Sequence, residues 1–146
     1  MRKRTLIYSM ILPLILWIAV VVTPASAQII SASVKFDPHF LNLALPAPSV
    51  VKAVIRFEEA SVADINRSTI LLEATLPPDT TYRVPGALVA EFDGCMVVNI
   101  IQAKIAHWGI APPYKVWLTI TGNLNATAGG TPFSGSGYIK VWTPPP

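Results

Sequence analysis

Lys115-Val-Trp-Leu-Thr-Ile-Thr121 and Tyr138-Ile-Lys-Val-Trp142 are two alternating runs near the end of the chain, and together they decide the fold. Apolar and polar residues alternate in both with a period of two, which is typical of antiparallel strands with one buried face. The aliphatic side chains fall on one face, made up of Val116, Leu118, Ile120, Ile139 and Val141. A hairpin of this kind does not stand alone, so a second layer of strands is expected over its apolar face.

The first 27 residues have the layout of a secretory signal peptide. Basic residues at positions 2–4 precede an apolar run from Leu6 to Val22, and the small residues Ala25-Ser-Ala27 follow. This order predicts a signal helix with cleavage after Ala27. The alternative is an uncleaved membrane anchor, because an apolar run of about 17 residues is near the lower limit for spanning a bilayer. In either case the remainder of the chain is expected to be secreted or held at the cell surface.

The positive charge of the chain belongs to this first segment. Eight of the eleven Lys and Arg residues and all eight Asp and Glu residues follow position 27, so residues 28–146 carry no net charge. Neutrality gives no indication of a nucleic-acid partner. Residues 28–146 are of ordinary size for one domain with a single core. Cys95 is the sole cysteine; we expect a buried free thiol, with a link to another chain as the alternative.

Short strand-like runs separated by proline and glycine fill the rest of the chain. A helical turn is expected at residues 61–65, and the Asp93-Gly94 pair predicts a tight hairpin turn. The expected strands cover residues 28–36, 40–45, 50–57, 68–76, 80–84, 87–92, 95–101, 115–121 and 138–142, with 122–137 as a loop. Together these runs predict an all-β, antiparallel β-sandwich of about seven or eight strands over residues 28–142, followed by a proline-rich tail at 143–146.

Four segments resemble a repeated secreted module of archaea and bacteria. They are FDPHFLNL at 36–43, VADINRSTILL at 62–72, LTITGNL at 118–124 and GTPFSGS at 130–136 followed by Ile139-Lys-Val141. The resemblance implies an immunoglobulin-like sandwich on an exported protein. That family has no agreed catalytic activity, so the resemblance implies fold and location rather than a reaction.

One departure from that family concerns metal binding. Its members often carry an Asp- and Gly-rich loop that looks able to hold calcium, where this chain has Glu91-Phe-Asp-Gly94. Calcium takes six to eight oxygen ligands, and two carboxylates fall short of that number. We therefore expect no metal and no other cofactor.

The residues that carry catalytic chemistry are sparse. His39 and His107 have no metal-ligand spacing, and Glu58-Glu59 are neighbours at a strand end, where side chains usually face opposite ways. The serines between 134 and 137 lie in an expected hairpin rather than in a strand-to-helix elbow. The sequence therefore predicts a protein that is not an enzyme.

The face opposite the apolar one is the best candidate for binding. It carries Trp117, Tyr138 and Trp142 beside Lys115 and Lys140. Exposed aromatic rings can stack on sugars or form a protein contact, but cross-strand pairing that stabilises the hairpin is an equally simple role. Asn66-Arg-Ser68 and Asn125-Ala-Thr127 are glycosylation sequons in expected loops.

Two functions fit these features. The first is an exported, non-catalytic structural or adhesion module of the cell envelope that contacts other envelope proteins or itself. A self-assembling form would donate residues 28–36 to a neighbour's sheet edge, although the same segment can fold back on its own domain. The second is a small carbohydrate- or ligand-binding module that uses the aromatic face.

Overall fold

The computed structural model describes residues 27–106 and 113–144. Residues 1–26 of the predicted signal segment, which covers 1–27, lie outside these ranges, as do His107 and the last two prolines of the tail. Among the described residues, no helix has the length and apolar character needed to cross a bilayer.

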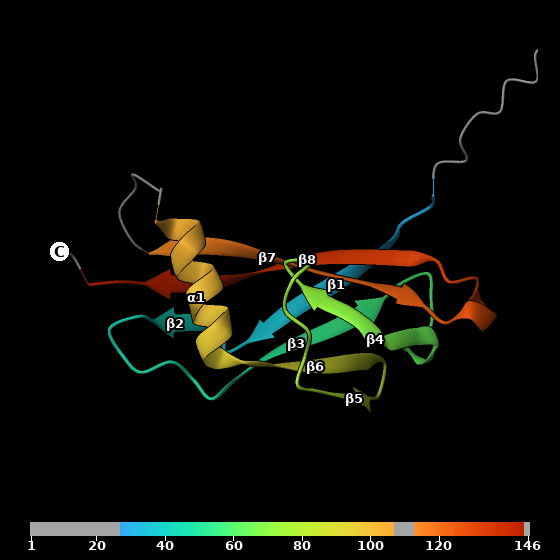
Figure 1. Cartoon of the computed structure of the whole chain (residues 1–146), viewed down its shortest axis with the longest axis horizontal. Coiled ribbons are helices and arrows are strands. Elements are labelled where there is room, and N and C mark those ends of the chain that lie inside the picture. Colours follow the sequence, from blue (N-terminus) through green and yellow to red (C-terminus); the bar gives the residue numbers. More distant parts are fainter. Residues whose placement is uncertain (1–26, 107–112, 145–146) are drawn as a thin grey trace, which may run out of the picture.

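Within the described ranges the chain forms one sheet of eight strands with a single α-helix, so the all-β prediction is confirmed. The elements are β1 (Ile30–Asp37), β2 (Phe40–Asn42), β3 (Val50–Phe57), β4 (Ile65–Leu72), β5 (Thr80–Val84), β6 (Ala87–Asp93), α1 (Gly94–Ile105), β7 (Tyr114–Leu124) and β8 (Pro132–Trp142), with short 3₁₀ turns at Val62–Asp64 and Ala126–Ala128. The strand order is β4-β7-β8-β1-β3-β6-β5, and β2 adds to β8. The sheet curls on itself, with β7 and β8 on one side and β3, β6 and β5 on the other (Figure 1).

The sheet is mixed, whereas the sequence predicted an antiparallel one. β1 pairs in parallel with β8 at Ile30–Phe133 and Ser31–Ser134, and β2 pairs in parallel with β8 from Phe40 to Asn42. Alternation of apolar and polar residues indicates which face of a strand is buried, but it does not indicate whether the strand runs parallel or antiparallel to its neighbour. The parallel pairing therefore could not be predicted from this pattern. The rest of β1 pairs antiparallel with β3 of the same chain. The segment considered for donation is therefore a strand of its own sheet.

The core lies between the two sides of the curled sheet. The predicted face of β7 and β8 is fully buried there, and it meets the inward side chains of β3 and β6. The largest members of this core are Phe92, Phe133, Ile55, Ile70, Leu72, Leu88, Ile101, Leu118, Ile120 and Ile139. Phe133 closes one end, where its ring meets the ring of Phe57 edge-on with centroids 5.1 Å apart.

β8 is much longer than the strand predicted at 138–142. The prediction was too short because the first half of β8 is rich in Gly and Ser, a composition typical of loops. Gly135 and Gly137 face the core, and the backbone of β1 passes directly over them. A Cβ atom on Gly135 would lie 2.3 Å from the carbonyl oxygen of Ala32, and one on Gly137 would lie 2.5 Å from that of Val34. These glycines thus permit a close approach of two strands, and the predicted loop at 122–137 shrinks to the turn between Leu124 and Pro132.

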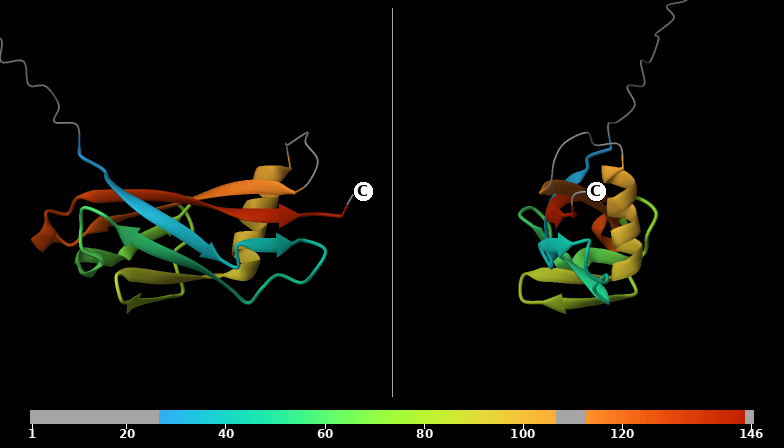
Figure 2. Two further views of the ribbon diagram at one scale, coloured as in Figure 1. Left: turned by 180° about the vertical axis from the view of Figure 1, so that it is seen from behind. Right: turned by 90° about the vertical axis from the view of Figure 1, so that its left-hand side faces the viewer.

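The predicted hairpin at Asp93-Gly94 is wrong, because helix α1 begins there. The Asp93 carboxylate accepts a hydrogen bond of 2.9 Å from the backbone N–H of Met96, so Asp93 is an N-cap rather than a turn residue. Val97 and Ile101 are spaced one helical turn apart, and both are fully buried. Helix α1 stands across the open side of the curled sheet and connects β6 to β7 (Figure 2).

Hydrogen bonds and an ion pair hold α1 against the edge of β7. The Lys104 ammonium donates a 2.8 Å hydrogen bond to the carbonyl oxygen of Trp117 and forms a 2.8 Å ion pair with Glu73. The other Glu73 carboxylate oxygen accepts a 2.6 Å hydrogen bond from the backbone N–H of Thr119. β4 ends at Leu72, so these side chains satisfy the part of the β7 edge that β4 does not cover.

Replacing Glu73 by alanine is expected to lower the free energy of unfolding by about 1–2 kcal/mol, because the change leaves the Thr119 N–H without its acceptor and removes the ion pair with Lys104. Glutamine keeps an acceptor for Thr119 and loses the partly exposed ion pair alone, so its cost should stay below about 1 kcal/mol. Urea unfolding of the two variants measures the difference. Equal losses would show that the hydrogen bond to Thr119 adds nothing to stability.

Candidate binding groove

The predicted aromatic face exists over β7 and β8, and its two central rings touch. Trp117 and Tyr138 are register partners on the two strands, and they meet edge-on with centroids 5.2 Å apart. The Trp117 side chain is 55% exposed and Tyr138 is 38% exposed. The Lys115 ammonium sits 5.2 Å from the centre of the Tyr138 ring, as a cation–π pair does. Tyr138 is therefore held by two neighbours, while Trp117 presents the freer ring.

This face continues into a groove where β1 leaves β8. After Ser31, β1 turns away to pair with β3, and β8 regains a partner on that side when β2 joins it at Lys140. Between these points lies a groove of about 540 Å³, which we call the aromatic–basic groove. Its lining residues are Ser33, Val34, Lys35, Phe36, His39, Trp117, Ser136, Gly137, Tyr138 and Lys140. Lys140 and Tyr138, both predicted as binding residues, therefore lie in one site with Trp117.

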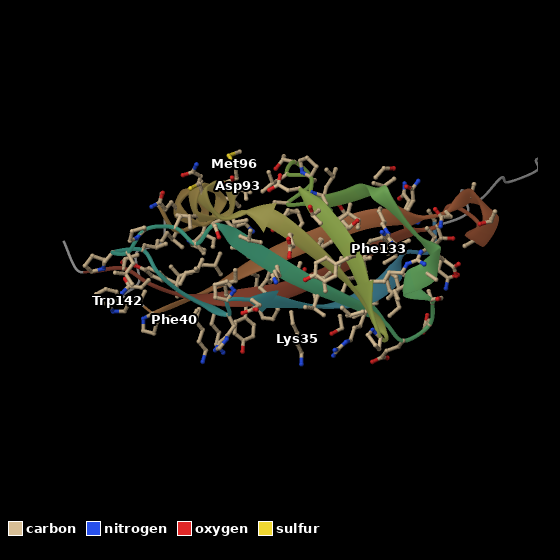
Figure 3. The ribbon with its side chains drawn as sticks, turned by 90° about the horizontal axis from the view of Figure 1, so that it is seen from below. Lys35, Phe40, Asp93, Met96, Phe133 and Trp142 are labelled. Atoms are coloured by element: carbon tan, nitrogen blue, oxygen red, sulfur yellow. The ribbon has the colours of Figure 1, made fainter. Side chains whose placement is uncertain are left out.

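Two lysines of the groove have no carboxylate partner among the described residues. Lys35 projects from β1 on the outer side of the sheet (Figure 3), and Lys140 of β8 lines the same groove. Lys52, farther along the same outer surface, is engaged: hydrogen bonds to Tyr82 and Glu91 hold its pKa above the ordinary value. Lys35 and Lys140 therefore place two positive charges, without an acidic partner among the described residues, beside the aromatic rings.

Trp142 was predicted as part of the same face, but it does not line the groove. It is half-buried beside Asn42 of β2, at the end of β8. Phe40 was missed: it is 48% exposed and is the register partner of Lys140. Figure 3 shows Trp142, Phe40 and Lys35 along one side of the molecule. The parallel pairing of β2 with β8 places Phe40 beside Lys140. A strand of three residues is too short for alternation to have predicted this position.

The other predicted sites lie apart from the groove. Asn125 lies in the β7–β8 turn, as expected, whereas Asn66 belongs to β4 rather than to a loop, and its amide oxygen accepts a 2.7 Å hydrogen bond from the hydroxyl of Ser68. Cys95 is exposed on α1, so the prediction of a buried thiol is wrong. The helix buries the side of Val97 and Ile101, and position 95 falls on its outer side.

The chemistry that this site offers is binding by stacking, charge and hydroxyl hydrogen bonds. No group of three or more His, Cys, Asp or Glu residues in the described ranges is arranged to hold a metal ion.

Comparison with protein-family models, with curated proteins and with solved structures finds no match for this chain.

Proposed function

We propose that the curled sheet is an immunoglobulin-like sandwich. The neighbours β1-β3-β6-β5 have the connectivity of strands A-B-E-D, and β4-β7-β8 have that of strands C-F-G. In this assignment β2 is an extra strand beside G, and α1 occupies the connection between E and F. The strand order supports the fold that the sequence resemblance implies.

We further propose that the protein is an exported, non-catalytic adhesion module of the cell envelope whose contact surface is the aromatic–basic groove. The observation that carries this proposal is the meeting, over one groove of about 540 Å³, of an exposed tryptophan with two lysines that have no acidic partner in the described part of the chain. Volumes of roughly 300–1,000 Å³ are usual for ligand sites.

The groove suits adhesion better than hairpin stability alone. The edge-on contact with Tyr138 covers only part of the Trp117 ring, and more than half of this side chain is exposed. The lining also extends beyond the β7–β8 hairpin, since β1 contributes Lys35 and the turn before β2 contributes His39. Convergence of this kind is the arrangement expected of a binding surface.

Binding of the fluorescently labelled full chain to cell envelopes of the producing organism tests this function. The wild-type protein should bind, and Trp117→Ala should reduce the bound fraction about tenfold. Tyr82→Ala is the control, because Tyr82 is an exposed aromatic residue on β5, outside the groove, although at 37% it is less exposed than Trp117 at 55%. Thermal unfolding of each variant verifies that the fold is intact.

Two results would contradict the proposal. One is an absence of binding by wild-type protein to envelopes that have been freed of their own copies. The other is equal binding by Trp117→Ala and Tyr82→Ala, which would assign Trp117 a role in packing alone.

A further inference from the structure

We infer that the aromatic–basic groove takes an acidic polysaccharide, a chain of pyranose rings that carry uronate carboxylates. This inference rests on the proposed adhesion function and names its ligand class. Three kinds of contact in the groove support it: ammonium groups, one accessible indole ring and a set of hydroxyl groups.

The ammonium groups set the charge of the ligand. Lys35 on β1 and Lys140 on β8 both line the groove, and neither forms an ion pair with a described residue. None of the lining residues is acidic, although Asp37 follows Lys35 on the same face of β1. A carboxylate lying between the two strands can form charge-assisted hydrogen bonds with both lysines, which are about twice as strong as neutral ones.

The indole of Trp117 sets the shape of the ligand. Of the two touching rings, the Tyr138 ring is contacted by both Lys115 and Trp117, whereas the Trp117 ring is the more exposed. A flat aromatic face beside polar groups suits a pyranose, which presents C–H groups on its faces and hydroxyls on its rim. The rim can reach the hydroxyl of Ser33 and that of Ser136, which is itself 2.8 Å from the Thr119 hydroxyl.

Other ligands use these contacts incompletely. A neutral glycan would stack on Trp117 but would leave Lys35 and Lys140 solvated. An acidic peptide would neutralise the lysines but would gain little from the indole and the serine hydroxyls. A uronate chain uses all three kinds of contact.

Isothermal titration of the full chain with oligogalacturonate tests the inference. The wild-type protein should bind it, and the dissociation constant should rise about tenfold in Trp117→Ala and at least as much in Lys35→Gln/Lys140→Gln. Tyr82→Ala and Arg67→Gln should bind as the wild type does, because both positions are exposed and lie outside the groove. Added salt should weaken binding, since partly exposed charges are screened.

Two further probes separate the contributions. Neutral oligoglucose of equal length and poly-glutamate should each bind at least tenfold more weakly than oligogalacturonate. Equal binding of poly-glutamate without dependence on Trp117 would overturn the inference in favour of charge alone, and equal binding of oligoglucose would overturn it in favour of stacking alone.

The envelope assay distinguishes failure of this inference from failure of the adhesion function. If oligogalacturonate does not bind while envelope binding still depends on Trp117 and is abolished by protease, the ligand is a protein, and the adhesion function stands without the polysaccharide. If neither oligogalacturonate nor envelopes bind, both proposals fail.

Discussion

Replacing Gly135 by alanine is expected to lower the free energy of unfolding by about 3 kcal/mol or more, which is a large share of the stability of an ordinary domain. The new Cβ would lie 2.3 Å from the carbonyl oxygen of Ala32, 2.8 Å from a methyl group of Val34 and 2.9 Å from the carbonyl carbon of Ala32. Two of these three atoms belong to the backbone of β1, so a change of rotamer cannot relieve the overlap. β1 must instead move away from β8. Urea unfolding measures the loss.

Gly86→Ala is the matched control for this substitution. Nothing lies within 4 Å of a Cβ at Gly86, but its φ of +70° disfavours a side chain. The control should therefore cost about 1–2 kcal/mol, from backbone conformation alone. A loss at Gly135 no greater than the loss at Gly86 would mean that β1 and β8 are not closely apposed in solution.

Replacing Gly94 by alanine is expected to have an effect of similar size, for a reason that the sequence did not indicate. A Cβ at this position would lie 1.7 Å from the carbonyl oxygen of Pro48, inside the connection between β2 and β3. The backbone N–H of Gly94 also donates a 3.2 Å hydrogen bond to the carbonyl oxygen of Ser49, which fixes that connection against the start of α1. We expect a loss of about 3 kcal/mol or more, measured by urea unfolding.

Gly94→Asn distinguishes the helix start from the hairpin turn that the sequence suggested. In a type I′ turn, position 94 would need a positive φ, which Asn tolerates better than alanine does, so Gly94→Asn would be milder than Gly94→Ala. At the first position of α1 the Asn side chain meets Pro48 just as alanine does, so both variants should be equally damaging. A stable Gly94→Asn protein would restore the hairpin interpretation.

The two central strands were predicted accurately from the sequence, and the elements around them were predicted less accurately. Alternation in residues 115–121 and 138–142 predicted the buried face correctly, because one face of each strand meets the core and the other meets water. Helix α1 was missed because the Asp93-Gly94 pair is also a strong turn signal. The spacing of Val97, Ile101 and Ile105 is helical, but the segment is rich in Val and Ile. These β-branched residues are common in strands, so the segment was predicted as a strand.

The aromatic–basic groove could be predicted only in part. Trp117, Tyr138 and Lys140 follow from the alternation of a single hairpin. Lys35 and His39 come from the beginning of the domain, and they reach the site because β1 and β2 flank β8, which lies at the other end of the chain. Pairing between segments so far apart in sequence leaves no local pattern, so that half of the site required the three-dimensional structure.

The parallel pairing of β1 and β2 with β8 has a mechanical consequence. The described domain begins its first strand at one end of the molecule and finishes its last strand at the opposite end (Figure 1). If tension pulled these two strands apart along their length, the backbone hydrogen bonds between β8 and its two parallel partners would be loaded together, in shear. They would not open one after another, as bonds do when a hairpin is peeled from its turn. Rupture would then require the simultaneous loss of this ladder, so the domain would resist extension along the line that joins the start of its first strand to the end of its last.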